Sequence, residues 1–218
     1  MADPTLELHQ GSTALASNDN WKTRPDGSSQ QAEIEATGIP PPDDLDSALV
    51  ATLNPGAYTT ILAGKDGGTG VGLVEVYDLA PASNSQVANI STRGFVDTGD
   101  NVMIGGFIVG GGSIGGSAHV LARALGPSLS NLGVSGALQD PILELHDESG
   151  SIVAMNDNWK ISSDGSSQQA EIEATTIPPT NDLESAILST LAPGSYTAIV
   201  RGVGNTTGVG LVEVYHLQ

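Results

Sequence analysis

Two short loops each bring together several side-chain oxygens of the kind that bind a hard cation. In both loops Asn and Asp residues precede a tryptophan, and a further Asp follows it. Calcium takes about six to eight oxygen ligands, which closely spaced Asp and Asn side chains and loop carbonyls can supply. The sequence therefore predicts two calcium sites, with the ligands Asn18, Asp19, Asn20 and Asp26 in the first loop and Asn156, Asp157, Asn158 and Asp164 in the second.

A second interpretation accounts for the same loops without a metal. The EF-hand pattern is absent, because no Gly and no terminal Glu follow at the required positions. Asx-turns, in which Asp and Asn side chains bond to nearby backbone, need the same residue types. In that interpretation Trp21 and Trp159 cover the edge of a core.

Two pairs of carboxylates have the spacing of an acid and a base. Glu171 and Glu173, like their counterparts Glu33 and Glu35, are two positions apart in a segment that alternates apolar and polar residues. Such alternation predicts a half-buried strand, which would place both carboxylates on one face. Glycoside hydrolysis needs a pair about 5 to 9 Å apart in a cleft. Any strand with one solvated face has this spacing, so we expect no enzymatic activity.

The glycine tract from Gly110 to Gly116 matches two catalytic patterns in spelling. Residues around Ser113 fit the nucleophile elbow, and the glycines fit the dinucleotide fingerprint. Both patterns need a strand followed by a helix, which an all-β chain does not supply. We therefore expect a hairpin loop here. The four histidines have no metal-ligand spacing either; they are His9, His119, His146 and His216.

Charge and composition exclude several classes of partner. The formal net charge is −18, from 25 acidic and 7 basic residues, so the chain repels phosphate backbones and anionic lipid headgroups. There is no cysteine, and no apolar run approaches the roughly 20 residues of a membrane helix. The sequence starts directly in a repeat. We therefore expect an excised piece of a longer secreted protein, located outside the cell or on its surface, that binds neither nucleic acid nor membrane.

The chain contains an internal duplication. Asp3–His9 recurs as Asp140–His146, and Asn18–Leu79 recurs as Asn156–Leu217 with about two thirds of the positions identical. Such self-similarity indicates repeated structural units. The predicted organisation is an incomplete first copy (1–79), a linker (80–86), a unique strand-rich segment that completes a sandwich (87–139) and a second copy (140–218).

Short alternating segments separated by Gly and Pro breakers predict an all-β fold. Asp44–Leu53 also fits a helical period, so a helical turn is the alternative there. A Pro-Gly-x-Tyr motif before Tyr58 and Tyr196 predicts a tyrosine corner in each copy. The predicted strands are Leu6–Leu8, Ala14–Ala16, Ala32–Ala36, Ala48–Leu53, Tyr58–Leu62 and Val71–Tyr77, with Val87–Val96, Asn101–Val109 and Ala118–Leu125 in the unique segment.

Both copies resemble the bacterial pre-peptidase C-terminal domain. The motifs that carry the resemblance are Pro141–Leu145, Gly150–Ala154, Asn156–Trp159, Leu191–Thr197 and Gly208–Val214, with Pro4–Leu8, Asn18–Trp21, Leu53–Thr59 and Gly70–Val76 in the first copy. The unique segment, at Ile90–Phe95 and Arg123–Leu129, looks like a tandem module of large secreted proteins of Verrucomicrobia-like bacteria. The resemblance implies antiparallel jelly-roll-like β-sandwich repeats that accompany enzymes without being catalytic, sometimes with calcium.

These observations favour a structural or adhesive module. A truncated sandwich exposes unpaired strand edges, which recruit other chains, so the incomplete copy predicts self-association that can run head to tail into a filament. The alternative is an accessory module of a secreted hydrolase that binds a glycan or cell-surface polymer by stacking sugars on Trp21 and Trp159. That alternative requires both indoles to be exposed.

Overall fold

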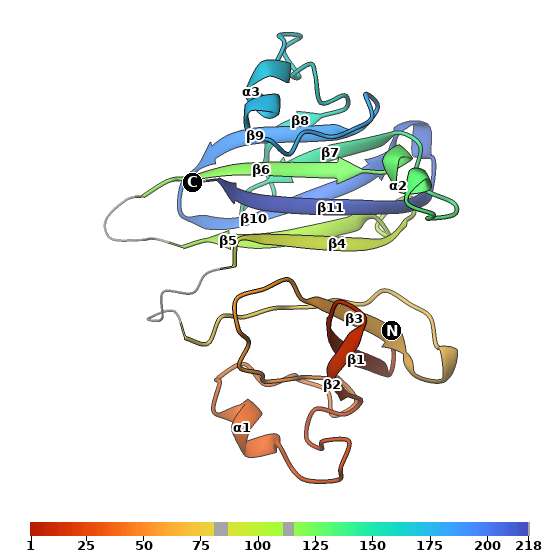
Figure 1. Ribbon diagram of the computed structural model, residues 1–218, viewed down its shortest axis with the longest axis vertical. Helices are drawn as coiled ribbons and strands as arrows, with labels where there is room; N and C mark the ends of the chain where they lie inside the picture. The colour runs from red at the N-terminus through yellow and green to blue at the C-terminus, as the bar shows by residue number, and fades with distance from the viewer. Residues whose placement is uncertain (81–86, 111–115, 218) are drawn as a thin grey trace. The chain divides into compact units, whose positions relative to one another are not determined.

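Antiparallel strands make up most of the regular structure in the computed structural model, which describes residues 1–80, 87–110 and 116–217. The chain divides into two units, Met1–Gln86 and Val87–Gln218 (Figure 1). The described residues form three antiparallel sheets, and the predicted all-β sandwich class is confirmed. No helix in the described ranges is long and apolar enough to cross a membrane.

Unit 2 is a sandwich of two four-stranded sheets. One sheet has the order β5-β10-β7-β8 and the other β4-β11-β6-β9. Their facing side chains share one core, which includes Val96, Leu143, Val200 and Val212. The strands are β4 (Asn89–Val96), β5 (Met103–Val109), β6 (Ala118–Leu125), β7 (Pro141–His146), β8 (Ile152–Asn156), β9 (Ser185–Leu191), β10 (Gly194–Gly202) and β11 (Gly208–Leu217).

The strands of the unique segment are interleaved with those of the second copy. β11 lies between β4 and β6, while β5 pairs with β10 at the edge of the other sheet. β6 also pairs with β9. Residues 87–139 therefore contribute strands to both sheets of unit 2, and the predicted strands β4, β5 and β6 are confirmed.

The described part of unit 1, residues 1–80, contains one three-stranded sheet of order β2-β1-β3, from β1 (Pro4–Gln10), β2 (Thr13–Asn18) and β3 (Thr59–Gly64). These strands correspond to β7, β8 and β10 of unit 2, and the same register shift occurs after Leu8 and Leu145. Residues 47–53 and 70–79, which correspond to β9 and β11, form no strand; Figure 1 draws them without arrows. The strands predicted at these two places in the first copy are therefore wrong.

Within the described residues, three short α-helices interrupt the strands. They are α1 (Gln31–Glu35), α2 (Pro127–Asn131) and α3 (Gln169–Ala174), and two 3-10 turns follow β3 and β10 at Lys65–Gly67 and Val203–Asn205. The strand predicted at Ala32–Ala36 is wrong, because that segment forms α1. The helix buries only one side chain, Ile34, so alternation over five residues could not distinguish it from a strand. Asp44–Leu53 forms no helix, so that alternative is wrong as well.

Candidate functional site

The first Asn of each predicted calcium loop is fully used in holding the loop together. Asn156 is buried; its amide nitrogen donates to the carbonyls of Asn158 and Ile161 at 3.3 and 2.7 Å, and its side-chain oxygen accepts from the Ala186 N–H at 3.0 Å. Asn18 makes the equivalent three bonds in unit 1. Asn156 therefore ties its loop to β9, and Asn18 ties the loop of unit 1 to Ala48, the counterpart of Ala186.

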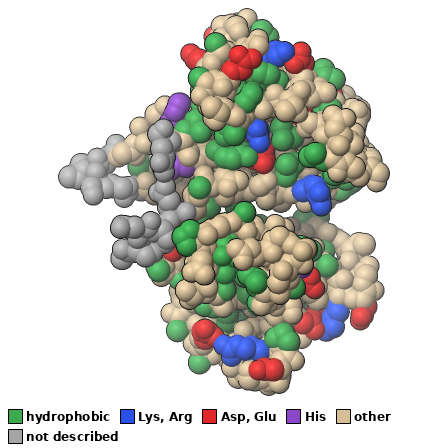
Figure 2. Space-filling view, viewed as in Figure 1, with side chains coloured by type: hydrophobic (Ala, Val, Ile, Leu, Met, Phe, Trp, Pro, Cys, Tyr) green, Lys and Arg blue, Asp and Glu red, His purple; other side chains and the backbone are tan. Residues whose placement is uncertain are grey.

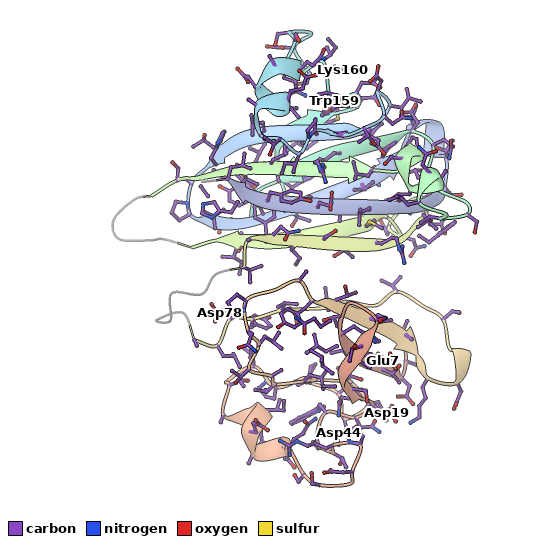
Figure 3. All side chains as sticks on the ribbon, viewed as in Figure 1. Glu7, Asp19, Asp44, Asp78, Trp159 and Lys160 are labelled. Atoms are coloured by element: carbon purple, nitrogen blue, oxygen red, sulfur yellow. The ribbon has the colours of Figure 1, made fainter. Side chains whose placement is uncertain are left out.

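The tryptophans that follow are core residues. Trp21 and Trp159 are each 4% exposed, and their indole N–H groups donate to the carbonyls of Asp43 and Asn181 at 3.0 and 3.1 Å. A lysine covers each ring, and Figure 3 shows Trp159 with Lys160 near α3; the ammonium lies 5.4 Å from the ring centroid. Because neither indole presents a face to solvent, sugar stacking on these two residues is excluded.

The last Asp of each loop closes an exposed turn. Asp164 accepts from the Ser162 hydroxyl at 2.5 Å and from the Ser166 N–H at 2.9 Å, and these bonds lower the pKa of its carboxyl to about 2. Asp26 makes the same kind of turn with Ser28, which lowers its pKa. The glycine after Asp164 has φ +85°, a conformation that other residues rarely adopt. The Asx-turn interpretation accounts for both residues.

The middle Asp of each loop lies near a second acidic residue that is not among the predicted ligands, Asp3 in unit 1 and Asp140 in unit 2. In unit 1, Lys65 Nζ lies 2.7 Å from Asp19 Oδ2 and 3.6 Å from Asp3 Oδ2. Unit 2 has Val203 in place of the lysine, and burial raises the pKa of Asp140, which the neighbouring Asp157 carboxylate raises further.

Several side-chain oxygens around these carboxylates make no hydrogen bond. One oxygen each of Asp3, Asp19, Asn20 and Asp140 is buried without a partner. The described residues nevertheless contain no group of three His, Cys, Asp or Glu side chains arranged for a metal. Calcium binding by these loops stays a prediction.

The paired glutamates do not form an acid–base pair on one strand face. Glu171 and Glu173 lie on α3, where residues two positions apart point in different directions. Glu173 accepts from the Gln169 amide at 2.7 Å, and Glu35 accepts from Gln31 at the same distance. Residues 111–115 of the glycine tract, which include Ser113, are not among the described residues, so the hairpin loop expected there stays a prediction. Residues 81–86 of the predicted linker are not among them either.

A buried ion pair joins β6 to β11. Arg123 Nε lies 3.1 Å from Glu213 Oε2, and the Tyr215 hydroxyl donates to Glu213 Oε1 at 3.0 Å. The two charged side chains are only 12% and 10% exposed. Arg123 also lies over the Tyr215 ring, 5.1 Å from its centroid, and burial raises the pKa of that tyrosine.

A second carboxylate, Glu184, is fully buried where α2 begins. It accepts from the N–H groups of Gly126 and Ser128 at 3.1 and 3.0 Å and from the Ser128 hydroxyl. Pro127 between them occupies the first helical position, a signal of helix initiation that the sequence contained. Glu184 thus fixes the end of β6 to the start of β9.

In unit 1, the residues that correspond to β11 are exposed to solvent. Residues 70–79 match β11 at nine of ten positions, yet Val74 is 38% and Val76 63% exposed, against 2% for Val212 and 6% for Val214. Hydrophobic side chains reach the surface of both units (Figure 2). Among the described residues, unit 1 buries three hydrophobic side chains and unit 2 buries 21. Unit 1 therefore presents an apolar, unpaired surface, and it is the strongest candidate for a functional site.

No family model, curated protein or solved structure matches this chain. The resemblance to the pre-peptidase C-terminal domain therefore stays a prediction.

Proposed function

We propose that this chain is a non-catalytic, extracellular structural or adhesive module, which associates with other molecules through its incomplete unit 1. The observation that carries the proposal is the exposure of residues 70–79. The equivalent strand of unit 2, β11, is flanked by strands on both sides, whereas residues 70–79 have no strand partner within the described ranges. The Val71 carbonyl accepts from the Met1 amino group at 2.5 Å, but this is not strand pairing. Backbone without a strand partner beside exposed valines is a template for another chain.

Association by edge pairing gives the proposal its geometry. β3 lies at one edge of its sheet, and in unit 2 the edge strands are β4, β5, β8 and β9. A contact between an open strand of unit 1 and an edge strand of unit 2 in the next molecule joins unlike surfaces. Such a contact extends head to tail into a filament if it does not close into a ring.

Light scattering and sedimentation velocity over a wide concentration range test the proposal. We expect the average mass of the unmodified chain to rise with concentration. Val76→Asp, which places a charge among the open residues, should remain monomeric. Leu132→Asp is the matched control, because Leu132 is 79% exposed and lies outside the edge strands of unit 2; it should associate as the unmodified chain does. A monomer at every concentration would contradict the proposal.

A further inference from the structure

Unit 2 contains a template for the molecule that would cover unit 1. There β4 and β6 pair along β11 from both sides, from Gly208 to Leu217. Gly210 packs against Val96 of β4 and Leu138 of the same segment so closely that a Cβ would lie 3.0 Å from the valine methyl. Residues 87–139 are therefore the natural cover for this strand sequence.

The surface that receives this cover is retained in unit 1. Residues 70–79 differ from β11 only at Asp78, which replaces His216, and residues 47–53 differ from β9 only by exchanges among small and aliphatic side chains. Leu53 is 43% exposed where Leu191 is 3% exposed. Unit 1 therefore keeps the apolar residues that such a segment would cover, but no segment covers them within the described residues.

A polar contact specifies which kind of segment fits. In unit 1 the Tyr77 hydroxyl donates to Glu75 at 3.0 Å, as Tyr215 does to Glu213. The Glu213 carboxylate also receives Arg123, but within the described part of unit 1 no basic side chain is paired with Glu75. Glu75 and Tyr77 thus form one half of an arginine site.

Asp46 supplies a second polar position. It replaces Glu184, whose carboxylate holds the N–H groups of Gly126 and Ser128 at the start of α2. Among the described residues the Asp46 carboxylate makes no hydrogen bond, and its backbone carbonyl still accepts from Trp21 as that of Glu184 accepts from Trp159. The carboxylate is therefore free for a donor from outside unit 1.

We infer that the preferred partner of unit 1 is a polypeptide segment with the chemistry of residues 87–139. Such a segment provides one strand on each side of residues 70–79, an arginine for Glu75 and Tyr77, and backbone N–H donors for Asp46. This inference rests on the proposed role of unit 1 as an acceptor and names the ligand of that surface.

The number of segments decides where the partner comes from. Each chain holds two acceptor surfaces and one segment, and that segment already pairs with the second copy. A second molecule that gave its segment to unit 1 would uncover its own β9 and β11, so exchange leaves the number of open surfaces unchanged. The partner is therefore a segment of this chemistry that is not paired with its own second copy.

Peptide binding to the full chain tests the inference. The probe is a fluorescent peptide of residues 118–131, which contains β6 and α2 with the arginine of position 123. We expect saturable binding of one peptide per chain by fluorescence anisotropy. Arg123→Met in the peptide, or Glu75→Gln in the protein, should weaken binding by about tenfold or more, because each leaves a buried charged or polar partner unpaired. Glu148→Gln, at an exposed turn, is the matched control and should bind as the unmodified protein does.

Hydrogen exchange locates the bound peptide. We expect new protection at residues 47–53 and 70–79. Equal binding of a scrambled peptide, or protection gained only in unit 2, would overturn the inference. The mass of the chain without peptide is measured separately, so a failure of self-association and a failure of peptide recognition are distinguishable.

Discussion

Arg123 and Glu213, 90 positions apart in the sequence, are neighbours on adjacent strands and form an ion pair that is nearly closed to solvent. The pair connects the unique segment to the second copy. Breaking a buried pair from one side costs more than removing both charges, because the remaining charge stays buried without a partner.

Arg123→Met should therefore destabilise unit 2 by about 3–5 kcal/mol, whereas the double change with Glu213→Gln should recover most of that loss. Urea unfolding followed by far-UV circular dichroism measures both. Arg93→Met is the matched control, since Arg93 is exposed on β4. A double variant as unstable as the single one, or an equal loss in the control, would refute the role of the pair.

The acidic pair Asp140 and Asp157 predicts a stabilising substitution. Unit 1 has Lys65 beside the equivalent carboxylates, and unit 2 has Val203. Val203→Lys should stabilise unit 2 at neutral pH by up to about 1 kcal/mol, because the ammonium offsets two like charges near the surface. Val153→Lys, at an exposed position of β8, should have no comparable effect. Thermal unfolding in low salt compares them, and an unchanged Tm for Val203→Lys would be the contrary result.

Asp164 predicts a dependence of stability on acid pH. Its pKa is lowered to about 2 by the bonds from Ser162 and Ser166, whereas an unfolded Asp titrates near about 3.9. Its contribution is therefore present above about pH 4 and is lost as the pH falls towards about 2. The stability difference between the unmodified chain and Asp164→Asn should shrink over that interval in urea unfolding. A constant difference would argue against the turn, and Asp100→Asn serves as the exposed control.

The predicted calcium sites give a fourth test. A ligand that binds only the folded state raises Tm, so bound calcium should raise it at millimolar concentration. Asp157→Asn should reduce the shift, because it removes one of the charged ligands, whereas Asp100→Asn should preserve it. Differential scanning calorimetry with and without a chelator provides the measurement. An unchanged Tm of the unmodified protein at millimolar calcium would exclude both loops as calcium sites.

The strands of unit 2 and the tyrosine corners followed from local pattern, which is why the sequence predicted them. The Tyr58 and Tyr196 hydroxyls donate to the carbonyls of Asn54 and Ala192 at 2.8 and 3.0 Å, which confirms both corners. Helices α1 and α3 were missed because one buried isoleucine in a single turn leaves no periodic signal.

The buried polar contacts required knowledge of the fold. Glu184 belongs to an acidic run whose composition is typical of a solvated loop. Its carboxylate is buried because the start of α2, far away in the sequence, packs against it and donates the Gly126 N–H. Similarly, nothing near Glu213 in the sequence indicates that Arg123 would face it. Conversely, residues 70–79 have a clear strand pattern but no strand, because a strand needs a neighbour that unit 1 does not supply.

Val74 and Val212 occupy equivalent positions in the two copies and provide a comparison of burial alone. Val212 is 2% exposed between two sheets, and Val74 is 38% exposed. Val212→Ala should cost unit 2 about 2 kcal/mol, from lost apolar burial and the cavity it leaves, whereas Val74→Ala should change stability by no more than about 0.5 kcal/mol. Urea unfolding monitored by hydrogen exchange assigns each loss to its unit. Equal costs would mean that residues 70–79 are covered in solution, and a large loss for Val74→Ala that appears only at high concentration would identify the cover as another molecule.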